Sequence, residues 1–403
     1  MARLAELQAS GAAVPMTRIA LITPIFPYPL DSGTRIRIFH LARYLARRHT
    51  VRVLSLEPGD TTLATAALGA PVETLPVLAL EGARERVGPF SFPRGIRERL
   101  WESVGQTGAE ILHVEKSFGA ALLGLPDRPV PLPVVLDEGC VHHISYWREA
   151  RVAPTAAARA RALLRWWRLR RFERRLAPVP HAVVAVSDGE AAYLRRLAPT
   201  ARVVVAPNGM DTDTVRSSPP GDAILFVGLM SYLPNRDAVR FFVREILPRL
   251  DGSLGGREFL VAGRDPGPEL EDLARRERRL RLLGFVGDLQ PLYDRAGVFV
   301  NPMRGGGGTR IKILEALAAG KAVVSTTVGV EGLAVTPGRD VIVADSPATF
   351  AGAVRELLAD PHRAWEIGRA GRALVEACYR WADCLAPLEA LYAEPLCPRT
   401  GRC

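Results

Sequence analysis

The sequence predicts an α/β fold in which two Rossmann-like, doubly wound domains face each other across a cleft. Three observations support this fold class. Short β-branched runs alternate with helical patterns from Arg18 to Ala206, and the same alternation restarts at Ala223. A segment rich in serine, proline and glycine separates the two halves. With 403 residues, the chain is also long enough for two domains with their own cores.

Each half of the chain supplies its own strands and helices. In the first half we expect strands at 18–23, 51–56, 110–114, 134–136, 182–186 and 202–206, and helices at 34–48, from 117, across 159–176 and from 188. In the second half we expect strands at 223–227, 258–262, 280–283, 298–301, 322–325 and 341–343, and helices at 237–250, 269–277, from 309 and between 347 and 394. Such alternation is typical of βαβ units, which place polar loops at the carboxyl ends of parallel strands.

The same pattern sets the expected domain boundaries. We expect a disordered extension at 1–16, an N-terminal domain at 17–207, a linker at 208–221, a C-terminal domain at 222–385 and a tail at 386–403. In an arrangement of this kind, a ligand is expected to bind in the crevice between the two domains.

Composition excludes several classes of protein. No stretch reaches the ~18 uncharged apolar residues of a membrane span. Residues 1–15 lack the continuous apolar core of a secretory signal, and Met16 is an alternative start, so we expect a cytoplasmic protein. The five cysteines show no paired spacing, which favours reduced thiols.

The net charge of +10 is concentrated in one predicted helix. Residues 159–176 hold many arginines and a single acid, Glu173. An apolar stripe runs along this helix at spacings of three or four, through Ala162, Trp166, Leu169, Phe172 and Leu176. Trp167 lies off the stripe, so the helix is suited either to anionic lipid headgroups, peripherally on the inner face of the cell membrane, or to plain solvent exposure. No zinc spacing or helix-turn-helix pattern supports nucleic acid as a partner.

Residues 303–320 combine a glycine-rich loop with the start of a helix. Gly305 to Gly308 lack a Cβ, so their amides can approach an anion, and the positive end of the helix points to the same place. Arg310 and Lys312 add two charges, which are unfavourable at a helix N-terminus unless an anion is bound. These features predict a site for a nucleotide diphosphate.

Glu315 lies one turn after Lys312 and can accept hydrogen bonds from ribose hydroxyls. The competing interpretation is a surface turn followed by an amphipathic helix, with Lys312 and Glu315 as an ordinary helical ion pair. The string from Asp211 to Asp213 resembles a metal-binding motif, but its position in the proline-rich linker favours a turn or a helix cap. We therefore expect neither a metal nor a cofactor.

At this point the sequence resembles the family 4 glycosyltransferases (glycosyl transferases group 1), enzymes of the GT-B fold. The resemblance covers about residues 17–385. It rests on these blocks in order: 184–187, 205–211, 224–228, 284–287 and 308–320. Residues 226–235, together with Arg310 and Lys312, are most similar to sugar transferases of bacterial exopolysaccharide clusters.

The resemblance implies an enzyme that transfers a sugar, of the hexosyl type, from a nucleotide diphosphate to a hydroxyl of a glycan or lipid-linked acceptor, with retention and without a metal. It assigns the donor to the C-terminal domain, the acceptor to the N-terminal domain and the ribose to Glu315. Where the family often has a further acid, this chain has Gly307. Leu229 follows Gly228 where many members carry a cation, so Arg310 and Lys312 alone would neutralise the departing diphosphate.

Further donor-binding candidates follow from position in the predicted fold. The amides of Gly306, Gly307 and Gly308, with Thr309 beside them, replace the missing acid. Polar or apolar residues that follow strands of the second half complete the expected donor site: Arg264, Phe285, Val286 and Glu331.

The first half supplies candidates for the acceptor and for catalysis. Gly33 can let the backbone approach the donor, while Asp31 and Arg35 flank an acceptor site or merely begin a helix. Asp137 and Glu138 end a strand, near His142 and His143. We expect a proton acceptor among Asp137, Glu138 and His142, and an acceptor contact at His143. Adjacent Asp137 and Glu138 point to opposite faces and do not form a hydrolase pair.

Two alternatives remain open from the sequence. A nucleotide-sugar epimerase of the same fold would act without an acceptor and would use acids and a histidine around the hexose. A non-catalytic basic protein that binds membrane or nucleic acid would retain the fold alone, but Arg310, Lys312 and Glu315 argue against it.

Overall fold

The structure is a computed structural model that describes residues 16–75, 84–87, 89–153, 155–250, 252 and 255–393. The described chain forms two compact units. The first unit comprises the described residues up to His143, Leu164–Pro207 and those from Ala382 onward. The second comprises Ile144–Leu163 and Asn208–Trp381. The expected extension at 1–15 lies outside the described residues.

The first unit is built on a parallel seven-stranded sheet of order β3-β2-β1-β6-β7-β8-β9. Its strands are β1 (Arg18–Thr23), β2 (Thr50–Ser55), β3 (Val72–Thr74), β6 (Ile111–Glu115), β7 (Val134–Asp137), β8 (Ala182–Ala185) and β9 (Arg202–Val205). A separate antiparallel hairpin pairs β4 (Arg84–Val87) with β5 (Phe90–Pro93). Strands β1 and β6 are in register from Ile19 opposite Ile111, so their carboxyl ends meet at one edge.

Helices cover this sheet. They are α2 (Gly33–Leu45), α3 (Thr61–Leu68), α4 (Ile96–Thr107), α5 (Lys116–Leu123), α8 (Asp188–Leu197) and α17 (Pro387–Tyr392), with α6 (His142–Val152) and α7 (Ala156–Leu176) shared by sequence between the units. Buried residues of α4, α5 and the end of α7 join alternate residues of the central strands in one core. Helix α8 begins where the Ser187 hydroxyl accepts a hydrogen bond from the Glu190 amide.

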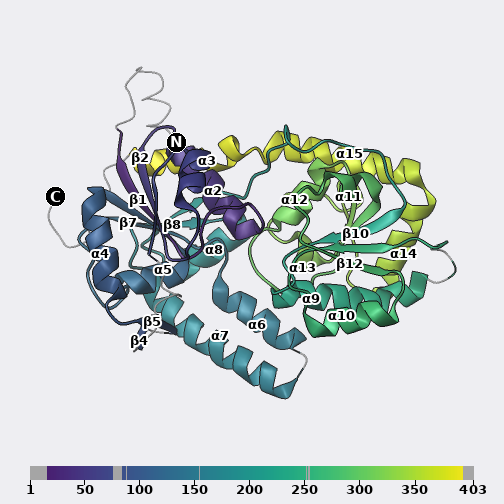
Figure 1. Ribbon diagram of the computed structural model, residues 1–403, viewed down its shortest axis with the longest axis horizontal. Coiled ribbons are helices and arrows are strands. Elements are labelled where there is room, and N and C mark those ends of the chain that lie inside the picture. Colours follow the sequence, from purple (N-terminus) through teal and green to yellow (C-terminus); the bar gives the residue numbers. More distant parts are fainter. Residues whose placement is uncertain are drawn as a thin grey trace. The chain divides into compact units, whose positions relative to one another are not determined.

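The second unit contains a parallel six-stranded sheet of order β12-β11-β10-β13-β14-β15. Its strands are β10 (Ala223–Val227), β11 (Phe259–Ala262), β12 (Leu280–Gly284), β13 (Ala296–Asn301), β14 (Ala322–Ser325) and β15 (Ile342–Val343). Its helices include α9 (Leu233–Phe241), α10 (Gly267–Arg276), α11 (Gln290–Arg295), α12 (Ile311–Ala318), α13 (Thr327–Val330), α14 (Pro347–Ala359) and α15 (Pro361–Cys378), and α16 (Trp381–Leu385) follows. Helices α9 and α10 lie on one face of the sheet, and α12 and α15 lie on the other (Figure 1).

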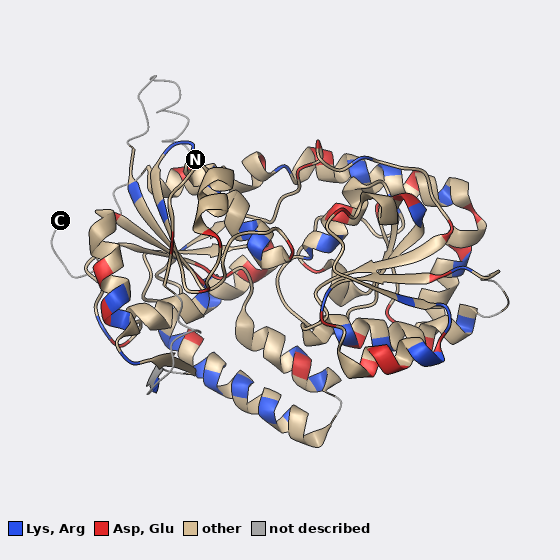
Figure 2. Cartoon of the chain, viewed as in Figure 1, with Lys and Arg blue, Asp and Glu red and all other residues tan. Residues whose placement is uncertain are grey.

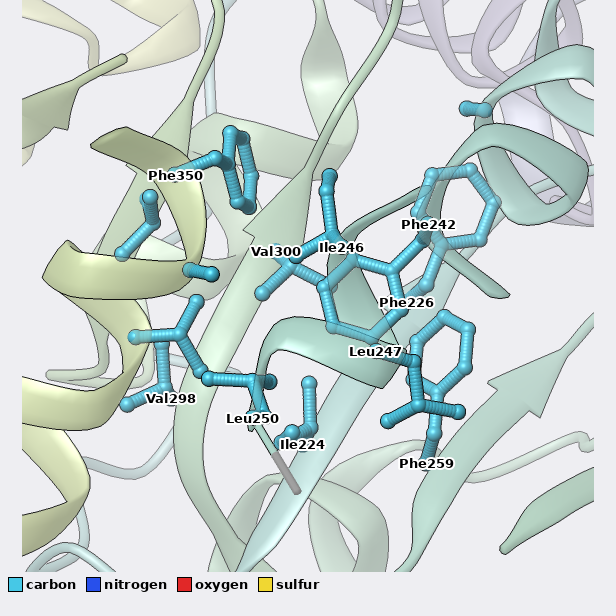
Figure 3. Packing of buried hydrophobic residues seen from close by; sticks show 14 of the residues in the cluster. Ile224, Phe226, Phe242, Ile246, Leu247, Leu250, Phe259, Val298, Val300 and Phe350 are labelled. Carbon is cyan, nitrogen blue, oxygen red and sulfur yellow. The ribbon is translucent and has the colours of Figure 1, made fainter. Parts of the chain in front are cut away.

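Aromatic side chains fill the core on the α9 face (Figure 3). Phe242 packs on Phe259 with ring centroids 4.3 Å apart and meets Phe350 of α14 edge to face at 6.2 Å. Each buried ring of this size stabilises the fold by about 1.5–3 kcal/mol relative to exposure. This core holds β10 and β13 rigidly, and the loops that follow these strands are fixed with them.

The expected strands of both sheets are present, but several elements were not predicted. These are α3, β3, the β4–β5 hairpin, α4, α6, α11 and α13. The helix expected at 237–250 begins earlier, at Leu233, because Pro234 favours the first turn of a helix. It then continues as a π-helical turn (Phe242–Ile246) and a 3₁₀ turn (Leu247–Leu250).

The division into units differs from the expected boundaries in two places. Residues 144–163 group with the second unit, where Arg240 donates to the Val152 carbonyl at 3.4 Å. Residues 382–393 group with the first unit, where the Tyr392 hydroxyl contacts Nδ1 of buried His113. The described part of the expected tail at 386–403 is therefore a packed helix, α17.

Helix α7 carries the basic segment. Ala162, Leu169, Phe172 and Leu176 are buried and Trp166 is half-buried, as the apolar stripe predicted. The arginines of α7 form successive blue bands along the helix in Figure 2. Trp167 remains 54% exposed beside these arginines. Among the described helices, none has the length and apolar character to cross a bilayer.

Candidate functional site

The glycine loop at 304–309 connects β13 to α12 in the second unit. Gly306 has a φ of 95°, a conformation that side-chain-bearing residues rarely adopt. A Cβ on Gly306 would lie 2.7 Å from the Tyr232 hydroxyl. The backbone angle therefore favours glycine at this position, whereas the contact alone would require only a shift of the end of the Tyr232 side chain.

Side chains hold the carbonyl oxygens of the loop. Arg148 donates to Gly306 O at 3.0 Å, and Arg310 donates to Gly307 O at 2.6 Å and also to Gly308 O. Asn208 donates to the Thr309 hydroxyl at 2.7 Å and to its carbonyl at 3.4 Å. A peptide's carbonyl and amide point in opposite directions, so the following amides face away from these donors.

The amides of the loop are unpaired. Within the described part of the chain, no acceptor is bonded to the amide of any residue from Gly305 to Thr309. Helix α12 begins next to them, at Ile311, and its N-cap residue Arg310 makes no side-chain cap. A row of free amides at a helix N-terminus is a preformed anion site.

Arg310 does not point outward as a simple ligand cation. Its side chain is buried at 6% exposure and its guanidinium donates to the loop carbonyls and to Val328 O at 3.5 Å. Arg310 thus braces the loop from inside while placing a full charge beside the free amides. The sequence predicted the charge but not the bracing.

Lys312 is a half-buried ammonium without a carboxylate partner among the described residues. Its Nζ donates to Asn235 Oδ1 at 2.6 Å and lies 4.3 Å from the centre of the Phe226 ring. Burial, with a smaller contribution from the Arg310 charge, holds the pKa of Lys312 well below its usual value. An uncompensated charge at such a site is stabilised when an anion binds.

Glu315 lies one helical turn further along α12. Burial raises the pKa of Glu315 to about 7, and the nearby Tyr293 hydroxyl opposes the rise. Tyr293 is itself buried in the core of the second unit. The Glu315 carboxyl therefore changes its charge near neutral pH. Once ionised, it can accept a hydrogen bond from a hydroxyl group.

The other donor candidates lie on loops at the same sheet edge. Arg264 follows β11 and is 41% exposed, 3.9 Å from the carboxylate of Asp265. After β12, Phe285 is 60% exposed, with Val286 beside it. Glu331 follows α13 but is ion-paired with Arg148, which lowers its pKa, so it is not a free carboxylate in this structure.

In the first unit, Asp137 at the end of β7 is fully buried and ion-paired with Arg37 at 2.7 Å. Burial alone would raise the pKa of Asp137, but the charge of Arg37 and the contact with His113 lower it to about 2. Next to this pair, burial and the charge of Asp137 raise the pKa of Glu115 to about 8. Asp137 is thus a structural anion, and its proposed role as proton acceptor is wrong for this geometry.

Glu138 follows Asp137, the last residue of β7. Its carboxylate lies 3.5 Å from Nδ1 of His142. Burial raises the pKa of Glu138 to about 7, with His142 opposing the rise. Burial by itself would lower the pKa of His142, but Cys140 and Glu138 raise it well above its usual value. The His142 side chain is 23% exposed, but its Nδ1 and the Glu138 Oε2 that faces it are both buried.

In the structure, all three acceptor candidates, His143, Arg35 and Asp31, are held by contacts within the protein. His143 is buried, with Nδ1 2.5 Å from Glu173 and Nε2 2.7 Å from the Tyr193 hydroxyl, so neither ring nitrogen is available. Arg35 is held by Asp31 at 3.0 Å and by Glu57 at 3.3 Å. These contacts occupy the guanidinium that was expected to meet an acceptor, and the Asp31 carboxylate with it.

Helix α2 begins at Gly33, which is exposed. Ser32 precedes it as N-cap but makes no side-chain cap, so the amides of the first turn have no capping side chain. In the linker, the Asp213 amide donates to Asp211 at 3.3 Å, which matches the predicted turn.

Sequence reasoning missed four residues that build the loop: Arg148, Asn208, Asn235 and Asp237. Asp237 is fully buried and binds Arg304, at the start of the loop, at 2.7 Å. Each of these residues is distant in sequence from the loop. Asn208 and Asn235 lie in the blocks 205–211 and 226–235 that carry the family resemblance, whereas Arg148 and Asp237 belong to no such block.

Two family models match the chain. The family described as "Glycosyltransferase Family 4" matches residues 32–214, and the one described as "Glycosyl transferases group 1" matches residues 221–360. Together these matches span most of both units.

Curated relatives match parts of the chain. The chain is 27% identical over 135 residues to a 44.6 kDa protein in the cps region of Klebsiella pneumoniae, covering 32% of this chain and 35% of that protein. It is 31% identical over 216 residues to the GDP-mannose-dependent alpha-(1-6)-phosphatidylinositol monomannoside mannosyltransferase of Mycobacterium tuberculosis, covering 47% of this chain and 55% of that protein. The matches thus span about a third and about half of these two relatives.

Solved structures resemble the whole chain. The sucrose-phosphate synthase of Thermosynechococcus elongatus superposes with a TM-score of 0.72 at 19% identity, covering 93% of this chain and 98% of that one. HepE of Anabaena, in complex with UDP-glucose, gives a TM-score of 0.68 at 15% identity, covering 93% and 100%. These similarities establish the GT-B fold. With the two family models and the glycine loop, they show that the chain belongs to the family 4 glycosyltransferases, group 1.

Proposed function

We propose that the protein transfers a sugar from a nucleotide diphosphate to a hydroxyl of a glycan or lipid-linked acceptor, with retention at the anomeric carbon. The observation that carries this proposal is the row of unpaired amides from Gly305 to Thr309 beside the half-buried, uncompensated Lys312. This arrangement suits a diphosphate, whose negative charge grows as the glycosyl bond breaks.

The relatives support the substrate class. One solved neighbour is described in complex with UDP-glucose, and one curated relative is described as GDP-mannose-dependent. A relative from a cps region supports a role in cell-surface polysaccharide synthesis. The nucleoside would lie near Phe285 and Val286, its ribose at Glu315 and the diphosphate at Gly306, Gly307 and Gly308.

Charge stabilisation by the protein itself makes the proposed reaction metal-independent. Lys312 and Arg310 place two cations beside the amide row, and this number of charges matches a diphosphate. Addition of EDTA should leave the rate unchanged, while a requirement for Mg²⁺ or Mn²⁺ would contradict this part of the proposal.

Glu138 and His142 are the proposed groups for the incoming hydroxyl. Glu138 Oε2 and His142 Nδ1 lie 3.5 Å apart, and the pKa values of both groups are displaced by burial and by each other. The pair can therefore hold a proton released by an acceptor hydroxyl near neutral pH.

Helix α7 is the proposed contact with an anionic membrane surface on the cytoplasmic side. Trp167 and Leu164 are exposed at 54% and 47% among arginines. An apolar side chain of this size inserts between headgroups while neighbouring guanidinium groups bind phosphates.

The donor proposal is tested by nucleotide binding. Calorimetric titration of the full chain with UDP and GDP should show binding that Lys312→Met weakens by at least about tenfold. Lys312→Met keeps an unbranched side chain that is one atom shorter and removes the charge. Equal affinities in the two proteins, both shown to be folded, would remove the donor assignment.

The transferase and epimerase alternatives are separated by products. With a nucleotide sugar and no acceptor, an epimerase would convert the sugar while the nucleotide diphosphate remains attached. The proposed transferase would release free nucleoside diphosphate only as an acceptor becomes glycosylated. Accumulation of an epimerised nucleotide sugar would overturn the proposal.

A further inference from the structure

Arg148 of α6 is the side chain that orients one peptide of the glycine loop. It donates to Gly306 O at 3.0 Å, and no other described side chain donates to this oxygen. By contrast, Gly307 O and Gly308 O are held by Arg310, from the loop's own segment. The orientation of the Gly306–Gly307 peptide thus depends on a side chain that lies 158 positions away in the sequence.

Holding this oxygen determines where one amide points. The Gly306 carbonyl and the Gly307 amide belong to one planar trans peptide and point in opposite directions. Gly306 itself has the free rotation of glycine and provides little restraint. Without the Arg148 contact, this peptide can turn over and present its oxygen instead of its N–H to a bound anion.

Arg148 also neutralises the carboxylate of Glu331. Its Nη2 lies 2.8 Å from Glu331 Oε1 and its Nη1 contacts Oε2, so the pair is bidentate. Glu331 is also close enough to Arg310 for the charge of Arg310 to contribute to the lowering of its pKa, after the larger effect of Arg148. Removal of Arg148 would therefore leave an unpaired negative charge facing the anion site.

The helix that carries Arg148 is itself anchored to the loop. Arg240 donates to Val152 O at the end of α6 and pairs with Asp237, which binds Arg304 at the start of the loop. The backbone of Arg148 would meet a Cβ on Gly305 at 3.7 Å. Helix α6 and the glycine loop are thus packed together within the second unit.

We propose that Arg148 is a positioning residue for diphosphate recognition, which it serves by fixing the Gly306–Gly307 peptide with its N–H toward the anion. The inference rests on the proposed donor site. It predicts that loss of Arg148 weakens binding of the diphosphate and leaves binding of the nucleoside unchanged, because the contacts of the guanidinium with Gly306 and Glu331 involve none of the residues proposed for the nucleoside.

The test compares affinities of the full chain for UDP and uridine, and for GDP and guanosine. Arg148→Ala should reduce the preference for diphosphate over nucleoside by about tenfold, with nucleoside affinity unchanged. Arg148→Lys, which keeps a hydrogen-bond donor for Gly306 O, should retain part of the preference for diphosphate over nucleoside. Arg151→Ala, an exposed arginine on the same helix, is the matched control and should behave as the wild type.

The double variant Arg148→Ala/Glu331→Gln separates orientation from charge neutralisation. Partial recovery of the preference supports a role in orienting the peptide, whereas full recovery overturns it. An unchanged preference in folded Arg148→Ala overturns the inference while leaving the donor site intact. A wild-type protein that binds diphosphate no better than nucleoside overturns the donor site and the inference together.

Discussion

Lys312 and Asn235 form a 2.6 Å hydrogen bond inside the second unit. The acceptor of the ammonium group is therefore the side-chain amide oxygen of Asn235, not a carboxylate. The pair leaves a positive charge without electrostatic compensation from any described acid. A protein that keeps such a charge loses stability by burying it.

The first prediction follows from this relationship. Lys312→Met should leave the ligand-free protein at least as stable as the wild type, because it removes a charge that burial disfavours. The thermal midpoint measured without nucleotide checks this expectation. The stabilisation by added UDP or GDP should shrink in the same variant, because its anion partner has been lost. A clearly lower midpoint without nucleotide would show that the charge stabilises the free protein.

The second prediction concerns pH and Glu315. Its folded-state pKa of about 7 lies above the ordinary value of 4.5, so the folded state binds the proton more tightly than the unfolded chain. The contribution of this group to stability is therefore full below about pH 4.5 and is lost as pH rises to about 7. Relative to the wild type, Glu315→Gln should gain stability as pH rises through this window. Urea titrations of both proteins at pH 5, 6, 7 and 8 measure the difference. A difference that does not change with pH would contradict the assignment.

A third prediction concerns the ion pair between Arg37 and Asp137. Asp137→Asn leaves a buried guanidinium without its anion and should destabilise the first unit by about 3–5 kcal/mol. The double variant Arg37→Met/Asp137→Leu should lose less, because no charge is left unpaired. The denaturant midpoints of the three proteins test this prediction: the wild type should be the most stable and Asp137→Asn the least.

The same pair gives a pH dependence of opposite sign. The pKa of Asp137 lies at about 2, below its ordinary value of 3.8. Its stabilising contribution is present above about pH 3.8 and disappears as pH falls toward 2. The difference between the wild type and Asp137→Asn should therefore shrink over this acid range.

The fourth prediction concerns the surface of α7. Trp167→Ser should weaken binding to vesicles that contain anionic phospholipid, and replacement of Arg165, Arg168 and Arg171 by glutamine should weaken it further. Vesicle sedimentation at low and at physiological salt measures both effects. Leu63→Ser, which alters an equally exposed residue on α3, is the control. Equal sedimentation of all variants would indicate a helix that is simply exposed to solvent.

Much of the fold could be predicted because it depends on local patterns. Strand β10 has the predicted bounds. A short, uninterrupted apolar run between turn residues is compatible with few structures other than a buried strand. The short helix α3 was missed because its small residues show no helical stripe. Its N-cap, Asp60, accepts hydrogen bonds from two amides, and this pattern was the available signal.

The site could be predicted where its residues are consecutive in the sequence. It could not be predicted where residues from distant parts of the sequence come into contact. The free amides of the glycine loop follow from a run of glycines, which the sequence displays directly. The role of Arg148 depends on a contact with Gly306 across 158 positions, which no local pattern contains. His143 failed as a candidate for the same reason, because its partners Glu173 and Tyr193 come from other elements.

Helix α17 has a consequence for how the molecule is made. It closes over the first unit through Tyr392 at His113 and through Glu389 at Tyr44 and Arg48. Because α17 follows the second unit in the sequence, the first unit stays incompletely covered until the second unit has been synthesised. Deletion of α17 would thus damage the unit that was translated earlier.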